Sequence, residues 1–232
     1  MILNCYDDFI NALLNAGFSM GTSNAEGIYA LIKWDWNEEP ADETPVRWYT
    51  GDPITDPNEW LGSILNKRDD IAYGKLFFKK SGYITKEWYP RFLATRREGL
   101  DFDAAYADGN LSHFAKRIYD VVSAHETIPV EEIKQLGGFL RENKSSFDRA
   151  LMELQMKMFI SPCGRQYKVS KRGEEYGMAS TVFCTTERLF GEAVFDEAEK
   201  ITKDNAAQEI REQVLKLNPE AQEKKIKKFI FG

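Results

Sequence analysis

The fold is decided by residues 112–184, SHFAKRIYDVVSAHETIPVEEIKQLGGFLRENKSSFDRALMELQMKMFISPCGRQYKVSKRGEEYGMASTVFC. From Phe114 onward, apolar residues recur at i, i+4, i+7 and i+8, which is the stripe of an amphipathic helix. Ser112 is placed to cap the start of this helix. Pro129 predicts the first turn of a second, shorter helix, which the glycine pair at 137–138 ends.

A third helix and a β-hairpin complete this stretch. The helix begins near residues 143–146 and is expected to bury Phe147, Ala150, Leu151, Leu154 and Met158. Residues 159–169 and 177–184 then predict two strands, joined by the polar segment 170–176. Three helices followed by a hairpin are the order of elements in a winged helix, an elaboration of helix-turn-helix.

The residues before this stretch mix helix and strand. Residues 5–16 carry a helical apolar stripe that Gly17 closes, and a second helix is expected over 57–66. Residues 27–36, GIYALIKWDW, are rich in β-formers, and the acidic segment NEEPADETP that follows predicts a solvated loop.

A cationic hairpin and helix are predicted next. Residues 75–78 and 83–84 flank Lys79-Lys80-Ser81-Gly82, whose glycine favours a tight turn. Thr85 can then cap a helix that runs to about Arg97.

The chain ends in two charged helices, over 206–217 and 220–231, that are broken at Asn218-Pro219. The basic end KKIKKFIF is expected to be a docked terminal helix with solvated lysines. The predicted fold class is therefore α+β, with an N-terminal α+β region over 1–110, a winged-helix domain over 111–191 and a C-terminal helical extension over 192–232.

Charge is strongly segregated in this chain of 232 residues with a formal net charge of −6. Residues 67–97 hold nine Lys or Arg side chains against three acidic ones, and residues 141–172 hold eight against three. Everything else carries 14 basic and 31 acidic residues. Because a phosphate backbone responds to the nearest surface, two cationic segments in an acidic protein suggest a nucleic-acid interface.

In a winged helix the N-terminal part of the third helix enters the major groove, and the hairpin tip contacts phosphates. The expected partner is duplex DNA, bound largely without sequence specificity, and Arg149 is the best candidate for reading a base. The expected contacts are Lys75, Lys79, Lys80, Lys86, Arg91, Arg96, Arg97, Lys144, Ser145, Ser146, Arg149, Arg165, Lys168, Lys171 and Arg172. Two alternatives stay open: lysines and arginines that merely face water, and a winged helix that binds another protein.

Composition argues against several other classes. The start MILNCYDDF lacks the cationic and apolar regions of a signal peptide, and no segment is apolar enough for a membrane span, so a cytoplasmic protein without membrane contact is expected. Cys5, Cys163 and Cys184 are widely spaced and predict reduced structural thiols. With only two histidines, His113 and His125, neither a metal site nor a cofactor is predicted.

The chain resembles the AlkZ-related group of bacterial proteins, relatives of the AlkZ (YcaQ-type) DNA glycosylases built from tandem winged helices. The resemblance lies in RDDIAYGKLFFKKSGYITKEWYPRFLATRR at 68–97, GLDFDAAYADG at 99–109, LQMKMFI and its hairpin at 154–184, TTERLFG at 185–191 and LNPEAQEKKIKKFI at 217–230. It implies a role with DNA, in the repair of alkylated bases.

The resemblance also implies a Gln-x-Gln or Gln-x-Asp pair that positions the attacking water. None of the glutamines of this chain has Gln or Asp two positions later, so the standard glycosylase chemistry is not expected. A divergent glycosylase would need another carboxylate, for which Asp69 and Asp70 are the candidates. A structural cap or ion pair is the preferred interpretation of these two residues.

Overall fold

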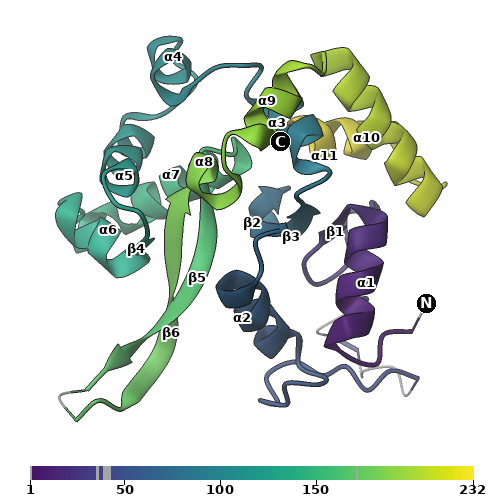
Figure 1. Ribbon diagram of the computed structural model, residues 1–232, viewed down its shortest axis with the longest axis horizontal. Helices are drawn as coiled ribbons and strands as arrows, with labels where there is room; N and C mark the ends of the chain where they lie inside the picture. Colours follow the sequence, from purple (N-terminus) through teal and green to yellow (C-terminus); the bar gives the residue numbers. More distant parts are fainter. Residues whose placement is uncertain (1, 35–36, 39–42, 171) are drawn as a thin grey trace.

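The computed structural model describes residues 2–34, 37–38, 43–170 and 172–232, without the side chain of Lys168 (Figure 1). The N-terminal part contains α1 (Tyr6–Ala16), β1 (Phe18–Met20), α2 (Pro57–Lys67), β2 (Ile71–Phe77), β3 (Lys80–Thr85) and α3 (Tyr89–Arg96). Its three strands form an antiparallel sheet in the order β1-β3-β2. Gly17 ends α1 with a φ of 86°, as predicted, and Asp56 caps α2 through the Asn58 N–H at 2.8 Å.

The middle of the chain has the predicted order of three helices and a hairpin. After α4 (Phe102–Ala107) come α5 (His113–Ser123), β4 (Ile128–Pro129), α6 (Val130–Leu136), a 3-10 turn (Arg141–Asn143), α7 (Lys144–Met156), β5 (Ile160–Val169) and β6 (Glu175–Thr185). Ser112 caps α5, as expected, by accepting a hydrogen bond from the Ala115 N–H at 3.2 Å. The short β4 adds to the hairpin, which gives a second sheet in the order β4-β6-β5. The hairpin projects away from the rest of the molecule (Figure 1).

The C-terminal helices are α8 (Thr186–Phe190), α9 (Ala193–Glu199), α10 (Lys203–Leu217) and α11 (Glu223–Phe231). They pack on the N-terminal sheet and on α3, which lie near them in space but far away in sequence (Figure 1). The Phe229 ring of α11 stacks on Phe77 of β2 at 4.0 Å and also contacts Phe18 and Phe92. The lysine-rich C-terminus is thus a docked helix, as its sequence predicted.

Three groups of buried side chains hold these elements. One joins the N-terminal sheet to α3 and the C-terminal helices. A second fills the space between α4, α5, α6, α7 and the base of the β5–β6 hairpin. A third lies between α1, α2 and the other side of the N-terminal sheet, around Phe9 and Trp60.

Three local expectations were wrong. Residues 27–34 form no strand: they contribute one isolated parallel bridge, from Ala30 to Met20, while β1 pairs with β3. Residues 35–36 of the predicted segment lie outside the described part. The turn of the cationic hairpin is Phe78-Lys79, and Gly82 lies within β3, where an added Cβ would fall 2.4 Å from the Phe77 ring. Thr85 belongs to β3, so it does not cap the helix α3, which begins four residues later.

No helix among the described residues is long and apolar enough to cross a membrane. Cys5, Cys163 and Cys184 are all free thiols. In the same described part of the chain, no three His, Cys, Asp or Glu side chains gather as metal ligands would.

Candidate nucleic-acid interface

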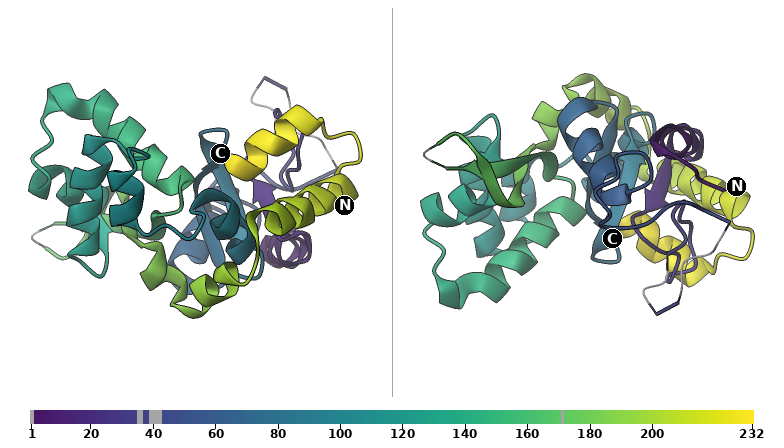
Figure 2. Two further views of the ribbon diagram at one scale, coloured as in Figure 1. Left: turned by 90° about the horizontal axis from the view of Figure 1, so that it is seen from above. Right: turned by 90° about the horizontal axis from the view of Figure 1, so that it is seen from below.

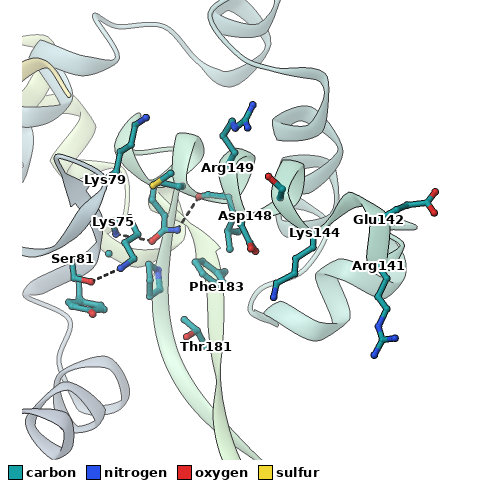
Figure 3. A pocket seen from close by; sticks show the side chains of 17 residues that line it. Lys75, Lys79, Ser81, Arg141, Glu142, Lys144, Asp148, Arg149, Thr181 and Phe183 are labelled. Carbon is teal, nitrogen blue, oxygen red and sulfur yellow. Dashed lines mark hydrogen bonds between the residues drawn. The ribbon is translucent and has the colours of Figure 1, made fainter. Parts of the chain in front are cut away.

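A cleft of about 960 Å³ lies between the β2–β3 hairpin and α7 (Figure 3). The base of the β5–β6 hairpin closes one side of it through Pro162, Thr181 and Phe183. The cleft therefore brings together the two cationic segments, which are about 70 residues apart in the sequence. Its wall is formed by Tyr73, Gly74, Lys75, Lys79, Ser81, Arg141, Glu142, Lys144, Ser145, Asp148, Arg149, Leu151, Met152 and Gln155.

Gln155 fixes the two walls to each other. Its buried side chain accepts a hydrogen bond from the Lys75 N–H at 3.0 Å and donates one to the Leu151 carbonyl at 3.0 Å. Gly74 permits this close approach, because a Cβ there would lie 3.0 Å from Gln155 Oε1 and 3.3 Å from Pro162 Cδ. The edge strand β2 is thus held against α7, and the cationic side chains on either side keep a defined separation.

The charges of the cleft are predominantly positive. Five cations line it, and two carboxylates, those of Glu142 and Asp148, oppose them. The lysine and arginine side chains are exposed, and only Lys75 donates to another side chain of the cleft, Ser81 Oγ at 3.1 Å. In Figure 3, Lys79 and Arg149 extend in the same direction from opposite walls, whereas Lys144 and Arg141 extend the other way. The cations are Lys75, Lys79, Arg141, Lys144 and Arg149.

The turn that presents Lys79 has an unusual composition. Phe78 and Lys79 have φ values of 52° and 63°, so both lie in the left-handed region of a type I′ turn. Asn-Gly is the usual pair at such a turn, because a Cβ costs about 1 kcal/mol or more there. Phe78 has a packing reason, since its buried ring lies 6.4 Å from that of Phe229. Lys79 is exposed and does not pack in the core, which suggests that its positive charge has a functional role at this turn.

We expect Lys79→Gly to raise the midpoint of thermal unfolding by a few degrees and, if the cleft is the nucleic-acid interface that the sequence predicts, to weaken DNA binding several-fold. Glycine relieves about 1 kcal/mol of left-handed strain, and the same substitution removes one cation from the cleft. Calorimetry and DNA titration of the same preparation measure the two effects. A loss of both stability and affinity would show that Lys79 supports the turn itself.

Two of the expected contacts lie inside the fold. The Arg96 guanidinium donates to the carbonyls of Leu76, Met156, Phe229 and Ile230 at 2.7 to 3.0 Å. Arg97 is buried, and its side chain pairs with Glu187 at 2.7 Å beneath the Phe159 and Phe195 rings. For these two residues the expectation of a surface contact is corrected, because the fold uses their donors internally.

Three other basic residues of the first segment are exposed or half-buried but lie outside the cleft. Lys80 pairs with Glu26 at 2.8 Å, and Arg91 pairs with Glu209 at 2.6 Å. Lys86 lies over the Phe190 ring, 5.8 Å from its centroid. These side chains lie on the side of the hairpin and of α3 that faces the C-terminal helices, and therefore do not reach the cleft.

The residues of the second cationic segment, 141–172, also differ in whether they line the cleft. Lys144, Ser145 and Arg149 line the cleft, while Ser146 is exposed beside it. Arg165 joins the hairpin to α2, since its guanidinium donates to Asn58 and its N–H donates to Asn66 Oδ1. Arg172 is exposed at the hairpin turn. Lys171 and the side chain of Lys168 lie outside the described residues.

Asp69 and Asp70 do not line the cleft. Asp70 accepts two hydrogen bonds from the Arg68 guanidinium, at 2.8 and 2.5 Å, and Asp69 is exposed beside it. The ion pair fits the structural role that the sequence favoured for this dipeptide.

Sequence reasoning did not single out Arg141, Glu142, Asp148 and Gln155 as members of the site. A signal for part of this set existed, because Lys144, Asp148, Leu151 and Gln155 follow one another at helical spacing. They form a face of α7 beside the apolar face of Phe147, Ala150 and Leu154, and of the four only Gln155 is buried. Nothing in the sequence indicated that the β2–β3 hairpin would lie opposite this face.

Comparison with known proteins gives one result. Neither the curated proteins nor the solved structures contain a match to this chain. A family model described as AlkZ related matches residues 3–231. Since that match spans nearly the whole chain, the protein belongs to the AlkZ-related family.

Proposed function

We propose that this protein binds duplex DNA across the cleft between α7 and the β2–β3 hairpin. The single observation that carries the proposal is that side chains from both cationic segments line one cavity. An acidic protein that merely keeps its lysines solvated has no reason to gather five cations around a concave surface. Membership of the AlkZ-related family supports a partner of this kind, because the name relates the chain to AlkZ-type DNA glycosylases.

In this proposal α5, α6, α7 and the β5–β6 hairpin act as a winged helix. The first turns of α7 approach the major groove, with Lys144, Ser145 and Ser146 on phosphates and Arg149 closest to the base edges. Lys75 and Lys79 hold the backbone from the opposite wall. Arg172 adds a phosphate contact at the hairpin turn. Because most of these groups are point charges, binding is expected to be largely independent of sequence.

A salt titration tests the proposal. Lys75, Lys79, Lys144 and Arg172 make four charged phosphate contacts in this proposal. These contacts alone should give a slope of log K against log salt of about −3.6 for a 20-base-pair duplex, so affinity should fall by on the order of 100-fold or more between 50 and 200 mM salt. Fluorescence anisotropy with two duplexes of unrelated sequence measures both the slope and the specificity. Binding that does not respond to salt, or no binding at 50 mM salt, would contradict the proposal.

We propose no reaction for this cleft. Gln155 is the glutamine in its wall, and both polar atoms of that side chain are already engaged by backbone groups. Asp70 is held by Arg68 outside the cleft. The proposed role is therefore binding of DNA, in the repair context that the family relationship suggests.

A further inference from the structure

The cationic surface does not end at the cleft, because α11 lies directly beyond the hairpin turn. Figure 2 shows the β2–β3 hairpin between the teal helices of the middle part and the yellow α11 in both views. Phe78 of the turn lies under two lysines of α11, with Lys225 Nζ 5.5 Å and Lys228 Nζ 5.7 Å from its ring centroid. Lys79, the next residue, faces the cleft on the other side.

Glu26 holds the hairpin and α11 together. Its carboxylate bonds Lys80 of β3 at 2.8 Å and Lys225 of α11 at 2.5 Å. The hydrogen bonds from Lys225 and Lys80 lower the pKa of Glu26 to about 2, so the carboxylate stays ionised and bridges the two cations at any physiological pH. The two surfaces are therefore joined by a charged contact as well as by the aromatic one.

Three lysines of α11 have no ion-pair partner among the described residues, although Lys228 lies over the Phe78 ring. Lys224, Lys227 and Lys228 are exposed, and no carboxylate of the described chain pairs with them. The nearest acid on the same helix, Glu223, is held by Arg211. Lys228 lies beside the hairpin through its contact with the Phe78 ring, and Lys224 precedes it by one helical turn.

We propose that Lys224 and Lys228 bind phosphates of the same duplex that lies in the cleft, so that α11 lengthens the DNA site past the hairpin turn. This inference rests on the proposed function. The nine residues of α11 rise about 13 Å, which corresponds to roughly four base pairs of duplex. An anionic membrane is the less favoured partner, because the apolar face of α11 is buried through Ile226, Phe229 and Ile230 and cannot enter a bilayer.

The test compares two double variants of the full chain on a 20-base-pair duplex. The two lysines add to the four charged phosphate contacts of the proposed function, so the wild type should show a slope near about −5.4, and Lys224→Gln/Lys228→Gln should return it to about −3.6, since each phosphate contact contributes about 0.9. Lys200→Gln/Lys216→Gln removes the same charge from exposed positions at the end of α9 and on α10, and should leave the slope within about 0.5 of the wild type. Thermal unfolding should be unchanged in both, because all four side chains are exposed.

Each outcome has a separate meaning. Equal slopes for the wild type and Lys224→Gln/Lys228→Gln would overturn the inference while leaving the cleft as the DNA site. No binding by the wild type would overturn the proposed function itself, and the inference with it. Sedimentation with vesicles of 30% phosphatidylserine provides the last arm: vesicle binding that depends on Lys224 and Lys228, with DNA binding unaffected, would assign α11 to a membrane surface instead.

Discussion

Reversing one charge on each wall of the cleft, in Lys79→Glu/Arg149→Glu, should lower the affinity for duplex DNA by on the order of 100-fold at 100 mM salt. The two side chains come from different walls and extend in the same direction (Figure 3). A phosphate backbone between them would lose two attractive contacts and meet two carboxylates in their place. Anisotropy titration measures the loss, and circular dichroism should show an unchanged fold because both side chains are exposed.

The matched control is Lys200→Glu/Lys216→Glu. These lysines are exposed directly after α9 and on α10, outside the wall of the cleft, and their reversal shifts the net charge of the protein by the same amount. If position decides binding, this variant should lose affinity only a few-fold through long-range repulsion, which salt screens. Equal losses in the two variants would mean that DNA responds to overall charge alone, and the cleft would lose its role.

Local patterns predicted most of the elements, because their causes lie within a few residues. The cap at Ser112, the stop at Gly17 and the break at Asn218-Pro219 act through hydrogen bonds or backbone geometry of the same segment. The prediction of the hairpin turn failed because its cause lies in a distant part of the chain. Gly82 suggested the turn, whereas the structure places it at Phe78-Lys79, where the buried Phe78 ring packs beside Phe229, about 150 residues away.

The site could be predicted only as two halves. Charge segregation predicted Lys79 and Arg149 as members of two separate cationic segments. Local structure then accounts for the position of Lys79 on the hairpin and of Arg149 on the helix. Their meeting depends on Gln155 and Gly74, a contact between α7 and the edge of β2 that no local pattern contains. The partners of the arginines in and next to α3 were equally unpredictable from the sequence. Arg91 pairs with a surface carboxylate, Arg96 donates to four carbonyls, and Arg97, the residue after α3, forms a buried ion pair.

Arg96→Met should destabilise the fold by roughly 3 to 5 kcal/mol, because four carbonyls would lose a charged donor in a partly buried site. Two of them, Phe229 and Ile230, lie in the last turn of α11, and Met156 is the last residue of α7. Helix C-termini carry partial negative charge, so one guanidinium neutralises both ends and ties them to Leu76 of β2. Desolvation lowers the pKa of Arg96 to about 10, which leaves the group charged at neutral pH. The midpoint of urea unfolding should fall accordingly.

Arg91→Met on the same helix is the control for lost charge and altered side-chain shape. Arg91 pairs with Glu209, whose side chain is 45% exposed, and such a surface pair contributes less than about 1 kcal/mol. Methionine keeps the apolar stem at either position. Arg91 donates to one carbonyl just before its own helix, that of Glu87 at 2.9 Å, and lies over the Trp88 ring, so the difference between the two variants reports mainly the bonds of Arg96 to carbonyls of other elements. If Arg96→Met costs no more than Arg91→Met, the ends of α7 and α11 are held by apolar packing around Phe229. A large difference would instead make Arg96 the residue that joins the C-terminal helices, the hairpin and α7 into one binding surface.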